Sequence, residues 1–115
     1  MRDFKSLKVW EKAHQLTLEI YNISQTFPAD ERFGLTSQMR RSSSSVPTNI
    51  AEGCGRNGKA ELKRFMSIGM GSASELEYQL ILIKDLGYID VEKFNALTTK
   101  TLEVKRMLGA YISKI

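Results

Sequence analysis

Apolar residues recur along this sequence at alternating steps of four and three positions, and this spacing constrains the fold more than any other feature. It runs through residues 9–27, 62–83 and 94–115. Side chains three and four positions apart share one face of an α-helix, whereas a strand would alternate every second residue. Residues 35–50 repeat the pattern more weakly, with small side chains in place of large ones. The spacing therefore predicts an all-α protein with four helices.

Turn and capping residues place the predicted helices near residues 6–26, 30–54, 59–86 and 90–114. Pro28 ends the first helix, and Asp30 is the predicted N-cap of the second. Gly87 is the predicted C′ residue after the third helix, and Asp90 the N-cap of the fourth. Because the connections are short, consecutive helices are expected to be antiparallel neighbours. The prediction is an up-down-up-down four-helix bundle that forms one domain over residues 1–115.

The second predicted helix contains a proline and a run of small residues. Pro47 lacks a backbone N–H, so we expect a kink there, or a helix that begins or ends nearby. Residues 42–45 are all serine, and the third helix carries Gly69 and Gly71. These small surfaces would let the second and third helices approach closely. A serine patch that contacts phosphate or is modified is the alternative.

The counts of cysteine and histidine bound the chemistry. One cysteine and one histidine exclude a disulfide within the chain and a zinc site built from several such residues of one subunit. Glu11 and His14 have the Glu-x-x-His spacing of a di-iron site, but only a symmetric dimer could supply a second pair. Cys54 has His14 as its only histidine base and no third group to orient it. We therefore predict no metal, no cofactor, no catalytic residue and no enzymatic activity. The enzyme alternative requires His14 to meet Cys54 or Glu52 across a subunit boundary.

The chain is 42% hydrophobic and 26% charged, a composition that can build a core. No apolar run reaches the roughly 18 residues of a membrane span. The first five residues, Met1-Arg2-Asp3-Phe4-Lys5, lack the apolar stretch of a secretory signal. A single cysteine suits a reducing compartment. We expect a soluble, cytoplasmic protein with no membrane partner.

The 17 Lys and Arg residues exceed the 13 Asp and Glu residues, for a net charge of +4. The excess lies in residues 36–64, which carry two acidic residues, Glu52 and Glu61, and six basic ones. The basic residues are Arg40, Arg41, Arg56, Lys59, Lys63 and Arg64. Clustered cations attract phosphate, so these six residues are the candidate contacts to RNA or DNA. An ordinary solvated face is the alternative.

Four polar residues fall near the small-residue seams of the predicted bundle, where a charge would be partly buried: Arg41, Asn49, Glu52 and Glu75. Partly buried charges require partners. We predict an internal polar cluster in which Arg41 pairs with Glu52 or Glu75, serving packing specificity or a subunit contact.

Four blocks of residues, taken in order, span nearly the whole chain. They are Phe4-x-x-Leu7-x-Val9-Trp10-x-x-Ala13, Phe27-Pro28-x-x-Glu31-x-Phe33-Gly34-Leu35-x-x-Gln38-x-Arg40-Arg41, Asn49-Ile50-Ala51-Glu52-Gly53-x-Gly55-Arg56 and Gly71-Ser72-x-x-Glu75-Leu76. Together they resemble a bacterial four-helix-bundle family, the proteins encoded in intervening sequences of 23S ribosomal RNA genes. That family is similar to the accessory variability proteins of diversity-generating retroelements. Those proteins assemble as five-subunit barrels and associate with a reverse transcriptase and nucleic acid.

The resemblance implies a four-helix bundle, a ring-like homo-oligomer with a pentamer favoured, and a role with RNA or DNA, but no catalysis. The matching residues include Arg40, Arg41 and Arg56. The sequence departs from the family at Ser42, where alanine is common, and at Pro47. Both departures bear on the local geometry of the second helix.

Self-association has a second argument, because each predicted helix carries apolar residues beyond its seam. These residues are Trp10, Tyr21, Phe65, Ile68, Leu82, Leu86, Tyr88, Ile89, Met107 and Ile112. We therefore predict a non-enzymatic oligomer that binds structured RNA or DNA through residues 40–64. The alternative is an interaction scaffold for a partner protein such as a polymerase or reverse transcriptase.

Overall fold

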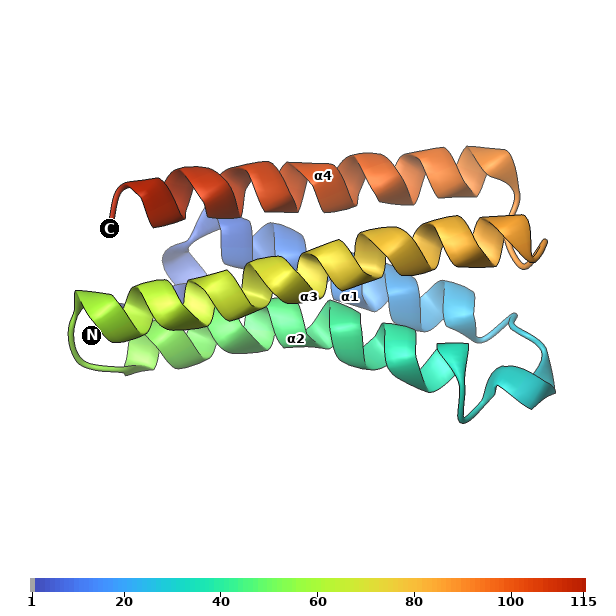
Figure 1. The fold of residues 1–115 in the computed structure, drawn as a ribbon, viewed down its shortest axis with the longest axis horizontal. Helices are drawn as coiled ribbons and strands as arrows, with labels where there is room; N and C mark the ends of the chain where they lie inside the picture. The colour runs from blue at the N-terminus through green and yellow to red at the C-terminus, as the bar shows by residue number, and fades with distance from the viewer. Residues whose placement is uncertain (1) are drawn as a thin grey trace.

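The computed structural model describes residues 2–115 and consists of four long helices (Figure 1). The α-helices are α1 (Lys8–Ser24), α2 (Leu35–Gly55), α3 (Lys59–Asp85) and α4 (Val91–Ser113). Two short 3₁₀ helices precede α1 and α2, over Phe4–Ser6 and Ala29–Glu31. The described residues contain no strand, so the predicted all-α class is confirmed.

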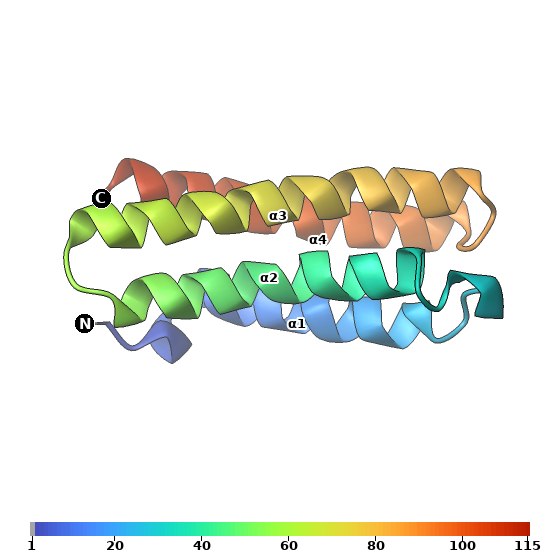
Figure 2. The ribbon, with the colours of Figure 1, turned by 60° about the horizontal axis from the view of Figure 1, so that its bottom comes forward.

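The four helices form an elongated body of 43 × 24 × 19 Å in which each helix contacts two others. The neighbouring pairs are α1–α2, α2–α3, α3–α4 and α4–α1, and consecutive helices run in opposite directions (Figures 1 and 2). The α2–α3 turn lies at the same end of the body as both chain termini, and the other two connections lie at the opposite end. This arrangement fits the predicted order of helices.

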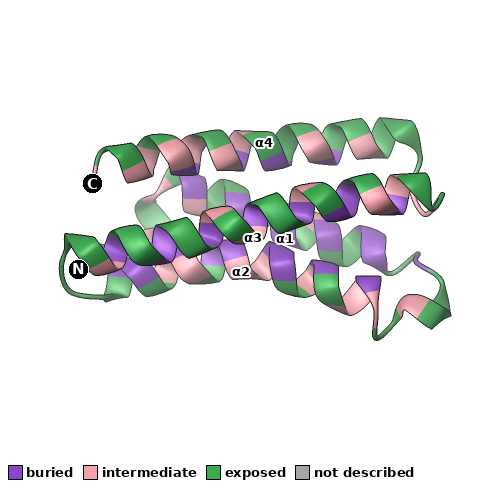
Figure 3. Cartoon of the chain, in the orientation of Figure 1, coloured by how far each residue is buried: buried purple, intermediate pink, exposed green. Residues whose placement is uncertain are grey.

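The buried residues follow the apolar seams expected from the spacing, and they recur along the sides of the helices that are turned toward other helices (Figure 3). Fully buried positions come from every helix and include Ile20, Ile50, Leu76, Leu80, Leu97 and Leu108. The 4–3 spacing thus describes one continuous core, because it keeps apolar side chains on the inner face of each helix.

Both predicted boundaries of the α3–α4 turn are confirmed. The carboxylate of Asp90 accepts a hydrogen bond of 2.7 Å from the amide of Lys93 and caps α4. Gly87 has a φ of +81°, and the amide of Tyr88 donates to the carbonyl of Ile83 over 2.8 Å. This is the Schellman arrangement, in which glycine adopts the left-handed conformation that ends a helix.

The predicted start of the second helix is wrong. Asp30 lies in a separate 3₁₀ turn, and α2 begins at Leu35 with Gly34 in the N-cap position. The carboxylate of Glu31 accepts the amide of Leu35 over 3.2 Å, so the side chain that caps α2 comes from that preceding turn. The predicted first helix also begins too early, because residues 4–6 form their own turn capped by Asp3.

The helix α2 continues through Pro47, so the expectation that a helix begins or ends there is wrong. The missing N–H of Pro47 leaves the carbonyl of Ser43 without its usual partner one turn earlier. The hydroxyl of Thr17, on α1, lies 2.9 Å from this carbonyl and 2.9 Å from the carbonyl of Ala13. A buried threonine on the neighbouring helix thus replaces the backbone donor that proline lacks.

The predicted close approach of the second and third helices is confirmed at Gly69 and occurs also at Gly53, whereas the predicted Gly71 faces outward with nothing within 4 Å of a Cβ there. A Cβ atom on Gly53 would lie 3.0 Å from the Cβ of Phe65, and one on Gly69 would lie 3.6 Å from the carbonyl oxygen of Val46. The serine run takes part in the same packing, since the hydroxyls of Ser45 and Ser72 lie 2.8 Å apart across the α2–α3 seam. Small residues therefore set the spacing of these two helices.

Candidate nucleic-acid interface

The structure separates the six predicted basic contacts into two groups. Arg56, Lys59, Lys63 and Arg64 flank the α2–α3 turn, at the end where the termini lie (Figure 1). Arg40 and Arg41 lie 15 or 16 residues earlier on α2, which is about 22–24 Å along the helix at 1.5 Å per residue. The six residues therefore do not form one continuous patch.

Additional basic residues join the first group because four helix ends meet there. We define the basic end as residues 2–11, 52–64 and 106–115. Its nine basic residues are Arg2, Lys5, Lys8, Arg56, Lys59, Lys63, Arg64, Arg106 and Lys114, and its four acidic residues are Asp3, Glu11, Glu52 and Glu61. The opposite end, residues 22–38 and 84–93, carries three basic residues (Arg32, Lys84, Lys93) and five acidic ones (Asp30, Glu31, Asp85, Asp90, Glu92). Charge is thus polarised along the bundle axis.

Two arginines of the basic end are held in place by an aromatic ring. The guanidinium groups of Arg56 and Arg64 lie 5.0 and 4.6 Å from the centroid of the Phe65 ring, which is buried. Each arginine also pairs with a glutamate of its own helix, Arg56 with Glu52 at 3.1 Å and Arg64 with Glu61 at 3.0 Å. These contacts position both guanidinium groups on the surface while leaving about half of each side chain exposed, 48% and 59%.

The lysines beside them are freer. Lys59 and Lys63 are exposed, and neither forms an ion pair within residues 2–115. Gly58 starts α3 with a φ of +88° and no side chain caps the helix amides that follow. Uncapped amides and unpaired ammonium groups at one helix start favour anions there.

Arg40 has a structural role at the other group. Its Nε donates to the hydroxyl of Ser24 over 2.8 Å, and its Nη2 donates to the carbonyl of Tyr21 over 3.3 Å. The guanidinium group also lies 4.9 Å from the centroid of the Tyr21 ring. Arg40 therefore ties α2 to the last turn of α1, where carbonyl groups lack helix partners. Its neighbour Arg41 is exposed.

The predicted ion pair of Arg41 with Glu52 or Glu75 is not formed, although Arg41 and Glu75 line the same pocket at the α2–α3 seam. All three side chains belong to exposed residues, and Glu52 pairs instead with Arg56 one turn along α2. Within the part of the chain that the structure describes, Arg41 forms no ion pair with either glutamate. Short polar groups such as Ser42 are buried at this seam, whereas Arg41 and Glu75 lie at its exposed rim.

Short polar side chains occupy the α2–α3 seam in its place. Asn49, the fourth predicted member, donates to the carbonyl and hydroxyl of Ser45 over 2.8 and 2.9 Å. The buried Ser42 donates to Gln79 over 2.6 Å, and Gln79 in turn donates to Glu75 over 3.4 Å. The predicted polar cluster did not include Ser45, Ser72 or Gln79, although Ser45 and the other serines of the run were expected to pack against the third helix.

The sequence predicts no catalytic role for His14 or Cys54. The contacts of both residues in the structure are packing contacts. The ring of His14 stacks on Trp10 with 5.2 Å between centroids, on an exposed part of α1. Cys54 is buried near the end of α2, and this burial raises the pKa of its thiol. Residues 2–115 contain no group of three or more His, Cys, Asp or Glu side chains arranged to hold a metal ion.

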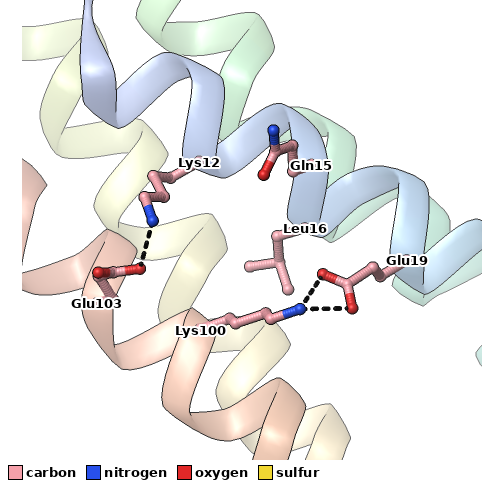
Figure 4. A pocket seen from close by; sticks show the side chains of 6 residues that line it. All are labelled: Lys12, Gln15, Leu16, Glu19, Lys100 and Glu103. Atoms are coloured by element: carbon pink, nitrogen blue, oxygen red, sulfur yellow. Dashed lines mark hydrogen bonds and ion pairs between the residues drawn. The ribbon is translucent and has the colours of Figure 1, made fainter.

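A polar pocket between α1 and α4 is closed by its own charges (Figure 4). Lys12 pairs with Glu103 at 3.4 Å, and Lys100 pairs with Glu19 at 2.8 Å. The four charged side chains reach across the α1–α4 seam towards one another. We assign this pocket to helix packing.

The fold and the basic end define the class of protein: an all-α, four-helix protein with a charge-polarised surface. The model of the 23S rRNA-intervening sequence protein family matches residues 5–110, and the chain belongs to this family. A crystal structure of a protein of unknown function from the S23 ribosomal protein family of Bacteroides thetaiotaomicron has the same fold, with a TM-score of 0.85. It is 24% identical in sequence, and the match covers 91% of this chain and 95% of that one. No curated protein matches the sequence. None of the helices in residues 2–115 has the length and apolar character that a membrane crossing requires.

Proposed function

We propose that this protein binds structured RNA or DNA through its basic end. The observation that carries the proposal is the meeting of four helix ends, which brings nine basic and four acidic residues to one end of the bundle. Phosphates are bound mainly by such clustered cations, with release of counterions from the nucleic acid. Contacts to phosphate position a protein without reading sequence, so we expect recognition of a duplex or stem rather than of a base sequence.

The surface differs in composition from the one proposed on the sequence alone. It keeps Arg56, Lys59, Lys63 and Arg64, and it adds residues from the start of α1 such as Lys5 and Lys8. We propose that the exposed lysines make the first phosphate contacts. The two arginines, oriented over Phe65, would provide contacts with less loss of side-chain freedom. We propose that the protein acts by binding, without catalysis or cofactor, in the cytoplasm.

We also propose that copies of this chain associate through the outer face of α3. Five residues recur there at steps of four and three: Ser67, Gly71, Ser74, Tyr78 and Ile81. All five are exposed, none is charged, and Tyr78 keeps 60% of its surface accessible. Small residues would let a second copy approach closely, as Gly53 and Gly69 do inside the bundle. A ring-like homo-oligomer, with a pentamer favoured by the resemblance to the retroelement accessory proteins, would repeat the basic end around an axis.

Light scattering tests the association. Ser74→Lys places a charge on the uncharged outer face of α3. It should therefore lower the mass in solution by weakening association, while the helical circular dichroism stays unchanged. Thr99→Lys, on the exposed face of α4, adds the same charge elsewhere and should leave the mass unchanged. Equal masses for all three proteins would contradict the assigned face.

Fluorescence anisotropy with a blunt RNA duplex tests the binding proposal. The variant Lys59→Gln with Lys63→Gln should bind more weakly and reduce the slope of log affinity against log salt by about 0.9 for each phosphate that is no longer neutralised. Lys84→Gln with Lys93→Gln removes the same charge from the opposite end and serves as the control.

Equal affinity and equal salt slope for the two variants would contradict the basic end as the binding surface. Absence of duplex binding by the unmodified protein would favour the second candidate, a scaffold for a partner such as a polymerase or reverse transcriptase. Exposed leucines on other helices, Leu18 on α1 and Leu102 on α4, are the observation that supports that candidate.

A further inference from the structure

We propose that a pocket at the α1–α2 corner binds an unpaired nucleotide, with its base on Phe33 and its phosphate between arginines. The pocket lies away from the basic end, has a volume of about 370 Å³, and includes Tyr21, Arg32, Phe33, Arg40 and Arg41 in its lining. We call it the arginine–aromatic pocket. The inference rests on the proposed nucleic-acid role and adds the kind of nucleic acid: one with a single-stranded segment beside a stem.

The ring of Phe33 is the first argument. Phe33 stands in the turn before α2 and keeps 88% of its surface exposed, more than any other large apolar residue described. The guanidinium group of Arg32 lies 5.4 Å from the centroid of this ring. Tyr21, on the facing helix, has the guanidinium group of Arg40 at 4.9 Å in the same way. The pocket thus contains two aromatic rings, each already paired with a cation, which is the composition of a stacking site for bases.

Charge is the second argument. Three guanidinium groups line the pocket, and no carboxylate is among its lining residues. The adjacent Glu31 is engaged elsewhere: one oxygen accepts the amide of Leu35 over 3.2 Å, and the other accepts the hydroxyl of Tyr88 over 2.7 Å. Within residues 2–115, Arg32 and Arg41 form no ion pair. The arginines therefore remain available to an anion.

Preorganisation is the third argument. Arg40 is fixed by its bonds to Ser24 and Tyr21, so that its guanidinium group already occupies the wall of the pocket. Two of its five N–H groups make these bonds, and the others remain for a ligand. Thr36 and Ser37, in the first turn of α2, add hydroxyl groups to the lining. A ligand would bind to groups whose freedom is already restricted, which reduces the entropic loss of binding.

The combination favours a nucleotide over an acidic peptide. Carboxylates would use the arginines and leave the exposed face of Phe33 without a partner. A nucleotide presents a flat base and a phosphate together, so it uses both kinds of group at once. The separation from the basic end, about 22 Å between Arg41 and Arg56 along α2, also lets the stem and the unpaired segment of one molecule occupy different sites.

The test compares two probes by fluorescence anisotropy: an RNA hairpin with a six-uridine loop, and the same stem as a blunt duplex. Phe33→Ala should weaken hairpin binding about five- to 150-fold, which corresponds to about 1–3 kcal/mol of base stacking, and should leave duplex binding unchanged. Phe33→Trp keeps a ring and should keep the affinity. Val91→Ala removes another exposed apolar side chain and is the control.

The pocket charges have their own readout. Arg41→Gln should reduce the salt slope for the hairpin by about 0.7, the value for one phosphate contact of a single strand. It should leave the slope for the blunt duplex unchanged. Lys59→Gln with Lys63→Gln should instead weaken both probes, because both contain the stem.

The outcomes separate the two proposals. If Phe33→Ala weakens binding of the hairpin but not of the duplex, the pocket is supported. This holds whether or not Lys59→Gln with Lys63→Gln changes duplex binding. Equal effects of Phe33→Ala on hairpin and duplex binding, or no effect on either, would overturn the pocket. The basic end would still be tested separately by Lys59→Gln with Lys63→Gln. A lower mass of Phe33→Ala in light scattering without RNA would also overturn the pocket, because Phe33 would then contact another copy of the chain.

Discussion

The helices α2 and α4 occupy equivalent places in the bundle, since each contacts both α1 and α3, but they are held by different chemistry. Apart from Arg40, which bonds to the last turn of α1, short uncharged groups join α2 to its neighbours: the hydroxyl of Thr17 to the carbonyl of Ser43 at 2.9 Å, and Ser45 to Ser72 at 2.8 Å. Long charged side chains join α4. Its pairs are Lys100–Glu19 at 2.8 Å, Lys105–Glu77 at 2.7 Å and Lys12–Glu103 at 3.4 Å.

The difference teaches where the bundle tolerates change. Hydrogen bonds between buried short groups require close backbone approach, and removing one partner leaves a polar group unsatisfied. Lysine–carboxylate pairs at the rim are flexible, exposed to water and screened by salt. We expect α2 to be the more firmly fixed helix. It also leads to both proposed sites: it carries Arg40 and Arg41 of the arginine–aromatic pocket, and Arg56 of the basic end is its C-cap residue.

The largest effect on stability is expected at Gly53. Gly53→Val places a branched side chain where a Cβ alone would lie 3.0 Å from Phe65 and 3.3 Å from the carbonyl of Leu62. Overpacking of this kind lowers the free energy of unfolding by about 1–3 kcal/mol. Urea unfolding monitored by circular dichroism measures it. Gly55→Val is the matched control, because a Cβ there meets nothing within 4 Å. Equal stability of Gly53→Val and Gly55→Val would contradict the idea that the close approach of α2 and α3 fixes α2 in the bundle.

A smaller effect is expected at Thr17, and it should depend on Pro47. Thr17→Val removes the donor to the carbonyl of Ser43 and should lower the free energy of unfolding by about 1–2 kcal/mol. In a Pro47→Ala background, the new backbone N–H can donate to that carbonyl, so the same change at Thr17 should have less effect. A double-mutant cycle in urea measures the coupling. Additive effects of the two substitutions would show that Thr17 does not replace the missing donor.

The ion pairs of α4 should contribute still less. Lys100→Gln breaks the pair with Glu19 and should lower the free energy of unfolding by about 0.2–1 kcal/mol at low salt. The loss should fade in about 1 M salt, where screening acts over a few ångströms. Lys93→Gln, on the same helix and without an ion pair among the described residues, is the control. A salt-independent loss as large as that at Gly53 would erase the contrast between α2 and α4.

The smallest effect concerns a link between the two sides of the bundle, from Tyr88 in the α3–α4 turn to Glu31 before α2. The hydrogen bond to Glu31 raises the pKa of Tyr88 above its ordinary value of 10.0. Because the folded pKa is the higher one, this contribution to stability is present below about pH 10 and is lost as the pH rises through the folded pKa. Glu31→Gln should lower the pKa of Tyr88, as followed by carbon NMR of the labelled ring. An ordinary pKa in the unmodified protein would contradict the link.

Features with short-range causes were predictable from the sequence. The apolar spacing identified the core seams, and Asp90 and Gly87 were recognised because caps act within a few residues of a helix end. The start of α2 was not, since Asp30, the predicted N-cap, belongs instead to a separate 3₁₀ turn, and the helix begins after Gly34. The predicted pairing of Arg41 failed for another reason. It required a distance between two side chains on different helices: Arg41 and Glu75 line one pocket at the α2–α3 seam but form no ion pair there.

The candidate sites show the same division on a larger scale. The sequence by itself determined four amphipathic helices, their antiparallel order and a basic excess around the second connection, because these follow from local spacing and short turns. Only the tertiary structure decided which charges share an end of the bundle: it brings Lys5 and Lys8 to the same end as Lys59 and Lys63, and it separates Arg40 and Arg41 from them. The same is true of Phe33, whose exposure depends on where the turn before α2 packs. Hydrophobic periodicity specifies the inner face of each helix, whereas the outer surface is assembled from residues that contact one another only after the helices have docked.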